Sequence, residues 1–159
     1  MKHSFLDTLL STNTYVNHSI QMTPIIDNVL FLGAQHTSND DMLSQNNIKR
    51  IISIGCVPLT NKYVTYKFDI DDNGGSTTQL FNDIIPKIHA IINECVKNNE
   101  PLLVHCQAGI SRSAISIITW LMKYKQMSYD EAYQFVKKRR PIIAPNIYFV
   151  DYAKHNFML

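Results

Sequence analysis

The residues best suited to chemistry stand together between His105 and Ser113, in the order His-Cys-Gln-Ala-Gly-Ile-Ser-Arg-Ser. Five residues separate the cysteine, Cys106, from the arginine, Arg112. An apolar run at residues 101–104 predicts a strand before this stretch, and residues 114–122 predict a helix after it. A short loop at the N-terminus of a helix can turn its N–H groups inward and bind an anion, and the helix adds partial positive charge.

These residue types indicate a thiolate nucleophile beside an oxyanion site. Cys106 at the base of such a loop should have a pKa well below the free value of roughly 8.5. The planar fork of Arg112 can hold two oxygens of a tetrahedral oxyanion. Gly109 provides the backbone freedom that the loop requires. A buried structural cysteine and a surface ion pair are the ordinary alternatives, but one loop holding all three features favours phosphoryl transfer through cysteine.

The motif His-Cys-x-x-Gly-x-x-Arg-Ser resembles the phosphate-binding loop of the cysteine-dependent phosphatases. The longer string Ala-Gly-Ile-Ser-Arg-Ser is similar to the dual-specificity protein phosphatases in particular. Residues 28–33 and 48–54 resemble the first strands of that family, and residues 139–146 resemble its segment before the last helix. The resemblance covers residues 24–157 and implies a compact, single-domain member of the atypical type.

The order of the patterns predicts an α/β fold, with a central, mostly parallel, twisted sheet flanked by helices. Continuous apolar runs at residues 51–54 and 101–104 are typical of strands buried on both faces. From residue 23 the chain reads strand, helix, strand, strand, helix, strand and then helices. Pro86 lies inside a helical pattern, which predicts either a kink there or a helix that begins near residue 82 or 83.

We divide the chain into an N-terminal extension, residues 1–22, and a catalytic domain, residues 23–159. Apolar residues in the extension could form one face of a short helix that docks on the domain or on a second copy, so a homodimer is one expectation (Phe5, Leu6, Leu9 and Leu10). Further along the chain, the stretch Ser128 to Glu131 has the form of a capping box.

The composition is that of an ordinary soluble domain. A hydrophobic content of 45% and a formal net charge of +2 argue against a nucleic-acid binder, a membrane protein or a disordered chain. Three cysteines at irregular spacing form no disulfide framework and no metal-ligand motif, so we expect no metal and no cofactor. A thiolate nucleophile needs a reducing compartment, which favours the cytoplasm, with the nucleus as an alternative.

The resemblance assigns roles to the remaining residues of the loop. It implies that the backbone of five residues binds the phosphate together with Arg112 (Gln107, Ala108, Gly109, Ile110 and Ser111). Ser113 fits a hydroxyl donor to the thiolate, or a simple helix cap. His105 should point away from the cysteine and support the loop. Asn146 either braces the loop or caps the final helix.

A leaving alkoxide or phenoxide needs a proton, so a carboxylic acid should lie on a loop near the cysteine. Residues 68–76 follow a predicted strand and contain three aspartates and a Gly-Gly pair. Strand alternation would place Asp69 and Asp71 on one face and Asp72 at the turn. The family resemblance favours Asp72 as the general acid, with Asp71 as the alternative.

Together these observations predict a phosphatase that hydrolyses phosphotyrosine and phosphoserine or phosphothreonine in proteins. One alternative is a phosphatase for a non-protein substrate, such as an RNA 5′-phosphate or a phosphoinositide. The uncharged variable positions of the loop argue against such highly anionic substrates. A second alternative is a pseudoenzyme that binds phosphate without hydrolysis, although Cys106 and Arg112 are both present.

Two features outside the loop carry smaller hypotheses. Cys56 follows a strand predicted to lie beside the strand of Cys106; we interpret it as an unreactive cysteine, and the alternative is a reversible disulfide between the two that protects the nucleophile. Arg139 and Arg140 are interpreted as a solvated basic helix end, or as residues that attract an anionic substrate.

Overall fold

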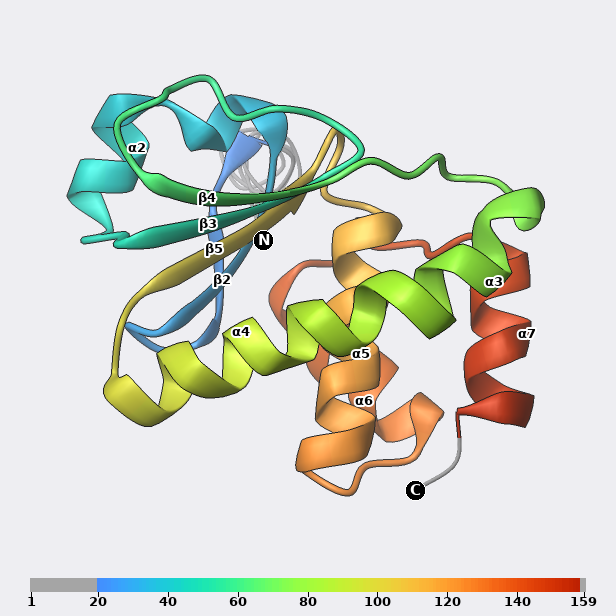
Figure 1. Cartoon of the computed structure of the whole chain (residues 1–159). Helices are drawn as coiled ribbons and strands as arrows, with labels where there is room; N and C mark the ends of the chain where they lie inside the picture. Colours follow the sequence, from blue (N-terminus) through green and yellow to red (C-terminus); the bar gives the residue numbers. More distant parts are fainter. Residues whose placement is uncertain (1–19, 158–159) are drawn as a thin grey trace, which may run out of the picture.

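The structure, a computed structural model, describes residues 20–157 (Figure 1). The strands are β1 (Thr23–Ile26), β2 (Leu30–Ala34), β3 (Arg50–Ile54), β4 (Val64–Phe68) and β5 (Leu102–Cys106). The helices are α2 (Asp40–Gln45), α3 (Thr77–Gln79), α4 (Ile85–Asn98), α5 (Arg112–Tyr124), α6 (Tyr129–Arg139) and α7 (Ile147–Asn156). Short 3₁₀ turns lie at η1 (Gln35–Ser38) and η2 (Gly74–Ser76), and a π turn at η3 (Leu80–Ile84).

The five strands form one sheet in the order β1-β2-β5-β3-β4. β1 is antiparallel to β2, whereas the other neighbouring strands are parallel. The prediction of a mostly parallel sheet flanked by helices is therefore confirmed. The sequence pattern had indicated one strand where the structure has two, β1 and β2. Asn28 lies between them with a φ of 63°, a left-handed conformation that asparagine tolerates, and it reverses the chain.

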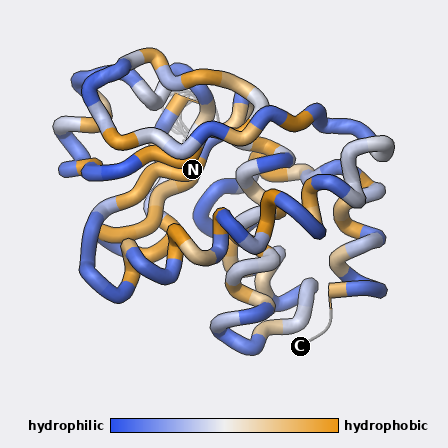
Figure 2. The backbone as a smooth tube through the Cα atoms, in the orientation of Figure 1, coloured by the Kyte–Doolittle hydropathy of each residue, from blue (hydrophilic) through white to orange (hydrophobic). Residues whose placement is uncertain are grey.

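Helices cover both faces of the sheet, and the apolar residues are concentrated along its central strands (Figures 1 and 2). The larger core lies under α4, α5, α6 and α7, and a smaller one lies under α2. Alternate residues of the central strands supply the two cores, because successive side chains of a strand point to opposite faces. In β5, Val104 and Cys106 belong to the larger core, whereas Leu103 belongs to the smaller one.

Pro86 lies in the first turn of α4, but the turns before it are already helical, so its missing N–H leaves one helical hydrogen bond unmade. Helical turns already begin at Thr77, and the π turn Leu80–Ile84 lies directly before α4. The chain is thus helical from Thr77 onward, rather than starting near residue 82 or 83, and the π turn ends two residues before Pro86.

Two further predictions from the sequence concern the start of α6 and the N-terminal extension. The capping box at the start of α6 is present, with Ser128 Oγ accepting from the backbone of Glu131 and the Glu131 carboxylate accepting from Ser128 N–H. Gln21 and Met22 already pack against the domain. The predicted short helix in the N-terminal extension lies outside the described residues.

Two absences hold for residues 20–157. None of the helices there combines the length and the apolar character that crossing a membrane would require. Nor do histidine, cysteine and carboxylate side chains gather there in a group that could hold a metal ion.

A buried histidine should make the stability of the fold depend on pH. Burial lowers the pKa of His89 from 6.5 to about 4, although its hydrogen bond to the carbonyl of Ser116 opposes the shift. The folded pKa lies below the unfolded one, so the stabilising contribution is complete above pH 6.5 and is lost as the pH falls toward 4. We expect a loss of about 3 kcal/mol in the free energy of unfolding across this window.

Urea unfolding at several pH values would measure this loss. His89→Gln keeps a donor near the position of Nε2 but cannot titrate, so its unfolding free energy should depend less on pH between 6.5 and 4. An equally steep dependence in the variant would show that His89 is not responsible.

Candidate active site

The loop between β5 and α5 is held by its carbonyl groups, which bond outward to neighbouring segments. The carbonyl of Gln107 accepts a hydrogen bond from the backbone N–H of Gln35, at 3.1 Å. The carbonyl of Ile110 accepts one from Ala144 N–H, at 3.0 Å. With these carbonyls fixed on the outside, the amide groups of the loop face its interior.

Arg140 holds the middle of the loop from behind. Its Nε donates to the carbonyl of Gly109 at 2.8 Å, and Nη2 donates to the carbonyl of Ala108 at 3.4 Å. Nη1 donates to the carbonyl of Gln21 and to Thr23 Oγ1, both at 2.9 Å. The side chain is fully buried, so the interpretation of this residue as a solvated basic helix end is wrong. The basic pattern could not reveal the burial, because the carbonyls that Arg140 serves are distant in sequence.

Gly109 is required by its backbone and by its surroundings. Its φ of 66° lies in the left-handed region that favours glycine. A Cβ atom at this position would also lie 2.7 Å from the backbone of Gly33 and 2.6 Å from Arg140 Nη2. The loop can therefore pack against β2 only with glycine here.

The sulfur of Cys106 lies at the base of this loop. Burial by itself would raise its pKa, but four hydrogen bonds to the sulfur outweigh burial, and the pKa lies below the ordinary 9.0. One is from the Ser113 hydroxyl, with Oγ 3.0 Å from the sulfur, and three are from backbone N–H groups of Ser113, Gly109 and Ile110. The site thus favours the thiolate, the form of cysteine that acts as a nucleophile.

Arg112 is the first residue of α5, and its side chain reaches across to residues 68–76, the segment with the candidate acids, called the acid loop below. Nη1 donates to the carbonyl of Ile70 at 2.9 Å. Its Nε is buried and has no acceptor among the described residues, which leaves a charged donor free for an oxyanion. The guanidinium occupies space beside Gly55, whose φ is 70° and where a Cβ atom would collide with it. Sequence reasoning missed Gly55, because no local motif links it to Arg112.

Of the candidate acids, Asp72 is the one that contacts the phosphate-binding loop. Its Oδ1 accepts a hydrogen bond from Ser111 Oγ at 2.6 Å. Asp71 is exposed and forms no hydrogen bond with the described residues. β4 ends at Phe68, so strand alternation does not extend to these aspartates.

Asn146 serves both roles that the sequence left open. Its Oδ1 accepts from the N–H of Tyr148 and caps α7. Its backbone N–H donates to Ser111 Oγ at 2.8 Å, and its Nδ2 donates to the carbonyl of Asp72 at 3.2 Å. The ring of Tyr148 lies directly against Gly74, so the start of α7 supports the acid loop at two points.

His105 points away from the nucleophile, to the opposite face of the sheet. Its Nε2 lies 2.6 Å from Ser53 Oγ, on the neighbouring residue of β3, and its Nδ1 lies 3.3 Å from the carbonyl of Cys106. Burial lowers the pKa of His105 to about 4, so the ring is neutral at pH 7. A neutral ring that donates from Nδ1 and accepts at Nε2 satisfies both contacts, and it supports the loop rather than acting as a base for the sulfur.

Cys56 lies near the same histidine, with its sulfur 3.6 Å from His105 Nδ1. Burial and the nearby Cys106 raise the pKa of Cys56 to about 11, although Arg112 opposes the shift. Both cysteines are free in the structure. A reversible disulfide between them stays a prediction, to be tested by peroxide treatment and peptide mapping without reduction.

Comparison with known proteins agrees with this geometry. Residues 30–153 match the family described as dual specificity phosphatase, catalytic domain. A protein named as a candidate tyrosine phosphatase, 123R, of Invertebrate iridescent virus 6 is 36% identical over 133 residues, covering 82% of this chain and 88% of that protein. Human dual specificity protein phosphatase 1 is 38% identical over 126 residues, covering 76% of this chain but only 33% of the longer human protein.

Solved structures show the same fold. The crystal structure of DUSP15 has a TM-score of 0.76 at 27% identity and covers 86% of each chain. The human tyrosine phosphatase-like serine/threonine/tyrosine-interacting protein has a TM-score of 0.74 at 28% identity, covering 83% of this chain and 92% of that one. The chain belongs to the dual specificity phosphatase family, within the cysteine-dependent protein tyrosine phosphatases. It is accordingly a protein phosphatase.

The hydroxyl of Ser113 should control the reactivity of Cys106. We expect Ser113→Ala to raise the pKa of the thiol, because the variant removes a donor to the thiolate. The rate of alkylation by iodoacetamide, measured against pH, gives this pKa directly. Ser116→Ala is the matched control, since its buried hydroxyl lies on the same helix but bonds to the carbonyl of Arg112. Equal midpoints in the two variants would contradict the assignment.

Replacing Gly55 should disable Arg112 without removing it. Gly55→Ala places a methyl group where the guanidinium lies, so we expect kcat/KM to fall about a hundredfold, as when one oxyanion donor is lost. Gly75→Ala is the control, because its Cβ atom would meet only Asn73 Oδ1, at 3.2 Å. Thermal unfolding of both variants separates lost alignment from lost folding, and unchanged kcat/KM in Gly55→Ala would refute this role.

Proposed function

We propose that the chain hydrolyses phosphotyrosine and phosphoserine or phosphothreonine in proteins, through a phosphocysteine intermediate. The observation that carries the proposal is the environment of Cys106, whose sulfur accepts hydrogen bonds from the loop amides and from Ser113. Beside it, the buried Nε of Arg112 supplies a charged donor for the phosphate. Nucleophile and oxyanion donors thus lie in one loop, as phosphoryl transfer requires.

In the first step, the thiolate of Cys106 attacks phosphorus in line with the ester oxygen. The S–P bond forms as the P–O bond to the substrate breaks. Asp72, in its protonated form, donates a proton to the leaving oxygen. Arg112 and the amides of the loop stabilise the charge on the oxygens of the transferring group.

In the second step, water attacks the phosphocysteine and the P–S bond breaks. The carboxylate of Asp72 takes a proton from the water, and inorganic phosphate leaves. The thiolate of Cys106 is now the leaving group, and the hydroxyl of Ser113 stabilises it. Ser111 acts as a positioning residue in both steps, because its hydroxyl holds Asp72.

The loop supports protein substrates over more highly charged ones. The side chains at its variable positions carry no charge that would meet additional phosphates (Gln107, Ala108, Ile110 and Ser111). The fold alone does not separate an enzyme from a binding protein, since one similar structure is named as a phosphatase-like interacting protein. Catalysis is favoured here because Cys106 and Arg112 are both present, at the end of β5 and at the start of α5.

Two expectations from the sequence extend the proposal to the cellular compartment and the oligomeric state of the protein. A reducing compartment, the cytoplasm, suits the thiolate of Cys106. Residues 1–22 could mediate a homodimer, and light scattering of the chain with and without residues 1–19 tests this. A monomer in both cases would refute the dimer.

Hydrolysis of p-nitrophenyl phosphate and of phosphopeptides tests the mechanism. We expect Cys106→Ser to abolish hydrolysis of both. Asp72→Asn should lower kcat by about a hundredfold or more on phosphoserine peptides, whose leaving oxygen needs a proton, and less on p-nitrophenyl phosphate, whose leaving group does not.

Asp71→Asn is the control, because this carboxylate makes no hydrogen bond to the described residues. A larger loss in Asp71→Asn than in Asp72→Asn would reverse the acid assignment. An inactive wild type would refute the enzyme, and activity on phosphoinositides or RNA 5′-phosphates but not on phosphopeptides would favour the non-protein alternative.

A further inference from the structure

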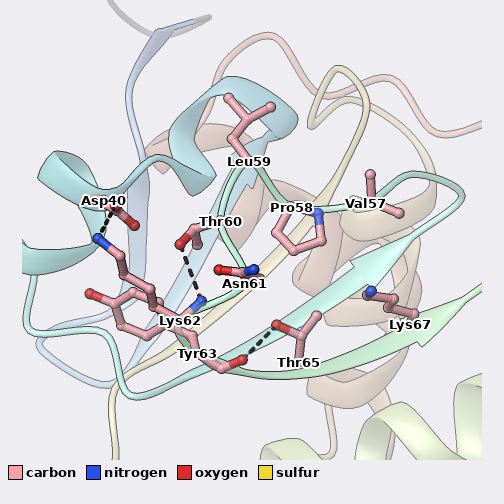
Figure 3. A pocket seen from close by; sticks show the side chains of 10 residues that line it. All are labelled: Asp40, Val57, Pro58, Leu59, Thr60, Asn61, Lys62, Tyr63, Thr65 and Lys67. Atoms are coloured by element: carbon pink, nitrogen blue, oxygen red, sulfur yellow. Dashed lines mark hydrogen bonds and ion pairs between the residues drawn. The ribbon is translucent and has the colours of Figure 1, made fainter.

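One cavity lies outside the residues that perform the chemistry, and none of its lining residues belongs to the phosphate-binding loop. It has a volume of about 780 Å³ and lies between the segment that follows β3 and the side of β4 (Figure 3). Val57 and Lys67 stand at one end, and Asp40 and Lys62 stand at the other. The volume is within the range of sites that bind ligands.

Short contacts connect this cavity to the active site. The side chain of Gln35 donates to the carbonyl of Val57 at 2.8 Å, and its backbone N–H donates to the carbonyl of Gln107 in the phosphate-binding loop. Gln35 therefore bonds both to the segment that lines the cavity and to the phosphate-binding loop. On the other side, Lys67 precedes Phe68, whose carbonyl accepts from the N–H of Gly55 at 2.7 Å. The end of the cavity marked by Val57 and Lys67 thus lies near the C-terminal edge of the sheet that carries the phosphate-binding loop, with the Lys67 side chain on the His105 face, opposite to Cys106.

The charges at the cavity favour an acidic occupant. Asp40 is its one carboxylate, and this group is already paired with Lys62 at 2.7 Å. Lys67 is exposed and forms no ion pair with the described residues. The cavity therefore presents one unpaired positive charge, and it presents that charge at the end nearest the active site.

Apolar side chains in the wall of this cavity favour an occupant that carries an apolar side chain next to its acidic one. Val57 and Leu59 are each 56% exposed, whereas most branched aliphatic residues of the described chain are buried; Ile20, Val64 and Ile147 are the other exposed ones. Both belong to the segment that forms the outer wall of the cavity. Burying them under a partner would be favourable at about 25 cal/mol for each Å² removed from water.

We propose that this cavity binds the substrate polypeptide next to its phosphorylated residue, and that it selects segments with an acidic side chain beside an apolar one. The inference rests on the proposed protein phosphatase function. With the phosphate in the loop, an extended substrate advances 3.3–3.6 Å per residue, so only positions a few residues away reach Lys67. Lys67 and the Val57–Leu59 segment would then determine sequence preference without taking part in the chemistry.

Kinetics with matched peptides test the proposal. The peptides share one phosphotyrosine and differ in carrying Glu-Leu, Lys-Leu or Ser-Ser pairs at the second and third flanking positions, on either side. For the wild type, we expect kcat/KM to be highest for the Glu-Leu peptides on one side of the phosphotyrosine. Lys67→Glu should lower that value about tenfold and raise the value for the matching Lys-Leu peptide, because attraction becomes repulsion.

Controls separate docking from catalysis. Lys87→Glu makes the same charge change at an exposed position on α4 and should leave the peptide preference unchanged. Lys67→Glu should keep the rate on p-nitrophenyl phosphate, which is too small to reach the cavity. Leu59→Ser should reduce the advantage of Glu-Leu over a Glu-Ser peptide.

Two outcomes would overturn the inference. One is an unchanged ratio of Glu-Leu to Lys-Leu rates in Lys67→Glu, and the other is an equal loss on peptides and on p-nitrophenyl phosphate. Failure of the proposed function is distinguishable from both, because the wild type would then hydrolyse none of the phosphopeptides.

Discussion

The active site depends on the direction of four carbonyl groups. Every residue from Gln107 to Ile110 has its carbonyl bonded to a neighbouring segment, two by backbone N–H groups and two by Arg140. A peptide plane whose oxygen is fixed outward directs its neighbouring N–H groups inward, and N–H groups in a concave loop bind anions. The thiolate of Cys106 depends on these amides, since burial alone would favour the thiol.

Arg140 is costly to bury, and this cost explains its hydrogen bonds. Burial lowers the pKa of the guanidinium to about 10, which still leaves it charged at pH 7. A buried charge is tolerated only with several partners, and the hydrogen bonds of Arg140 include three to carbonyls and one to a hydroxyl. The same bonds join the start of β1 to the loop, so the first strand of the domain and its catalytic loop are positioned together.

Much of the site was predictable from sequence because its residues are close together in the chain. The spacing of Cys106, Ser113 and Arg112 indicated one loop at a strand–helix junction, and the apolar runs indicated a parallel sheet. Gly55 and Arg140 were not predictable in this way. They act through contacts with residues far away in sequence, and their own neighbours form no motif. The reversal at Asn28 was missed for a different reason, since its flanking strands both read as apolar.

Asp72, the proposed acid, and Cys106 share their support, although they lie 34 positions apart in the chain. Arg112 holds the carbonyl of Ile70, and Ser111 holds the carboxylate of Asp72. Both donors belong to the segment that carries Cys106 into α5, so the acid loop is positioned by the phosphate-binding loop itself. Asp72, the proposed proton donor, and Cys106 are therefore positioned by one set of contacts.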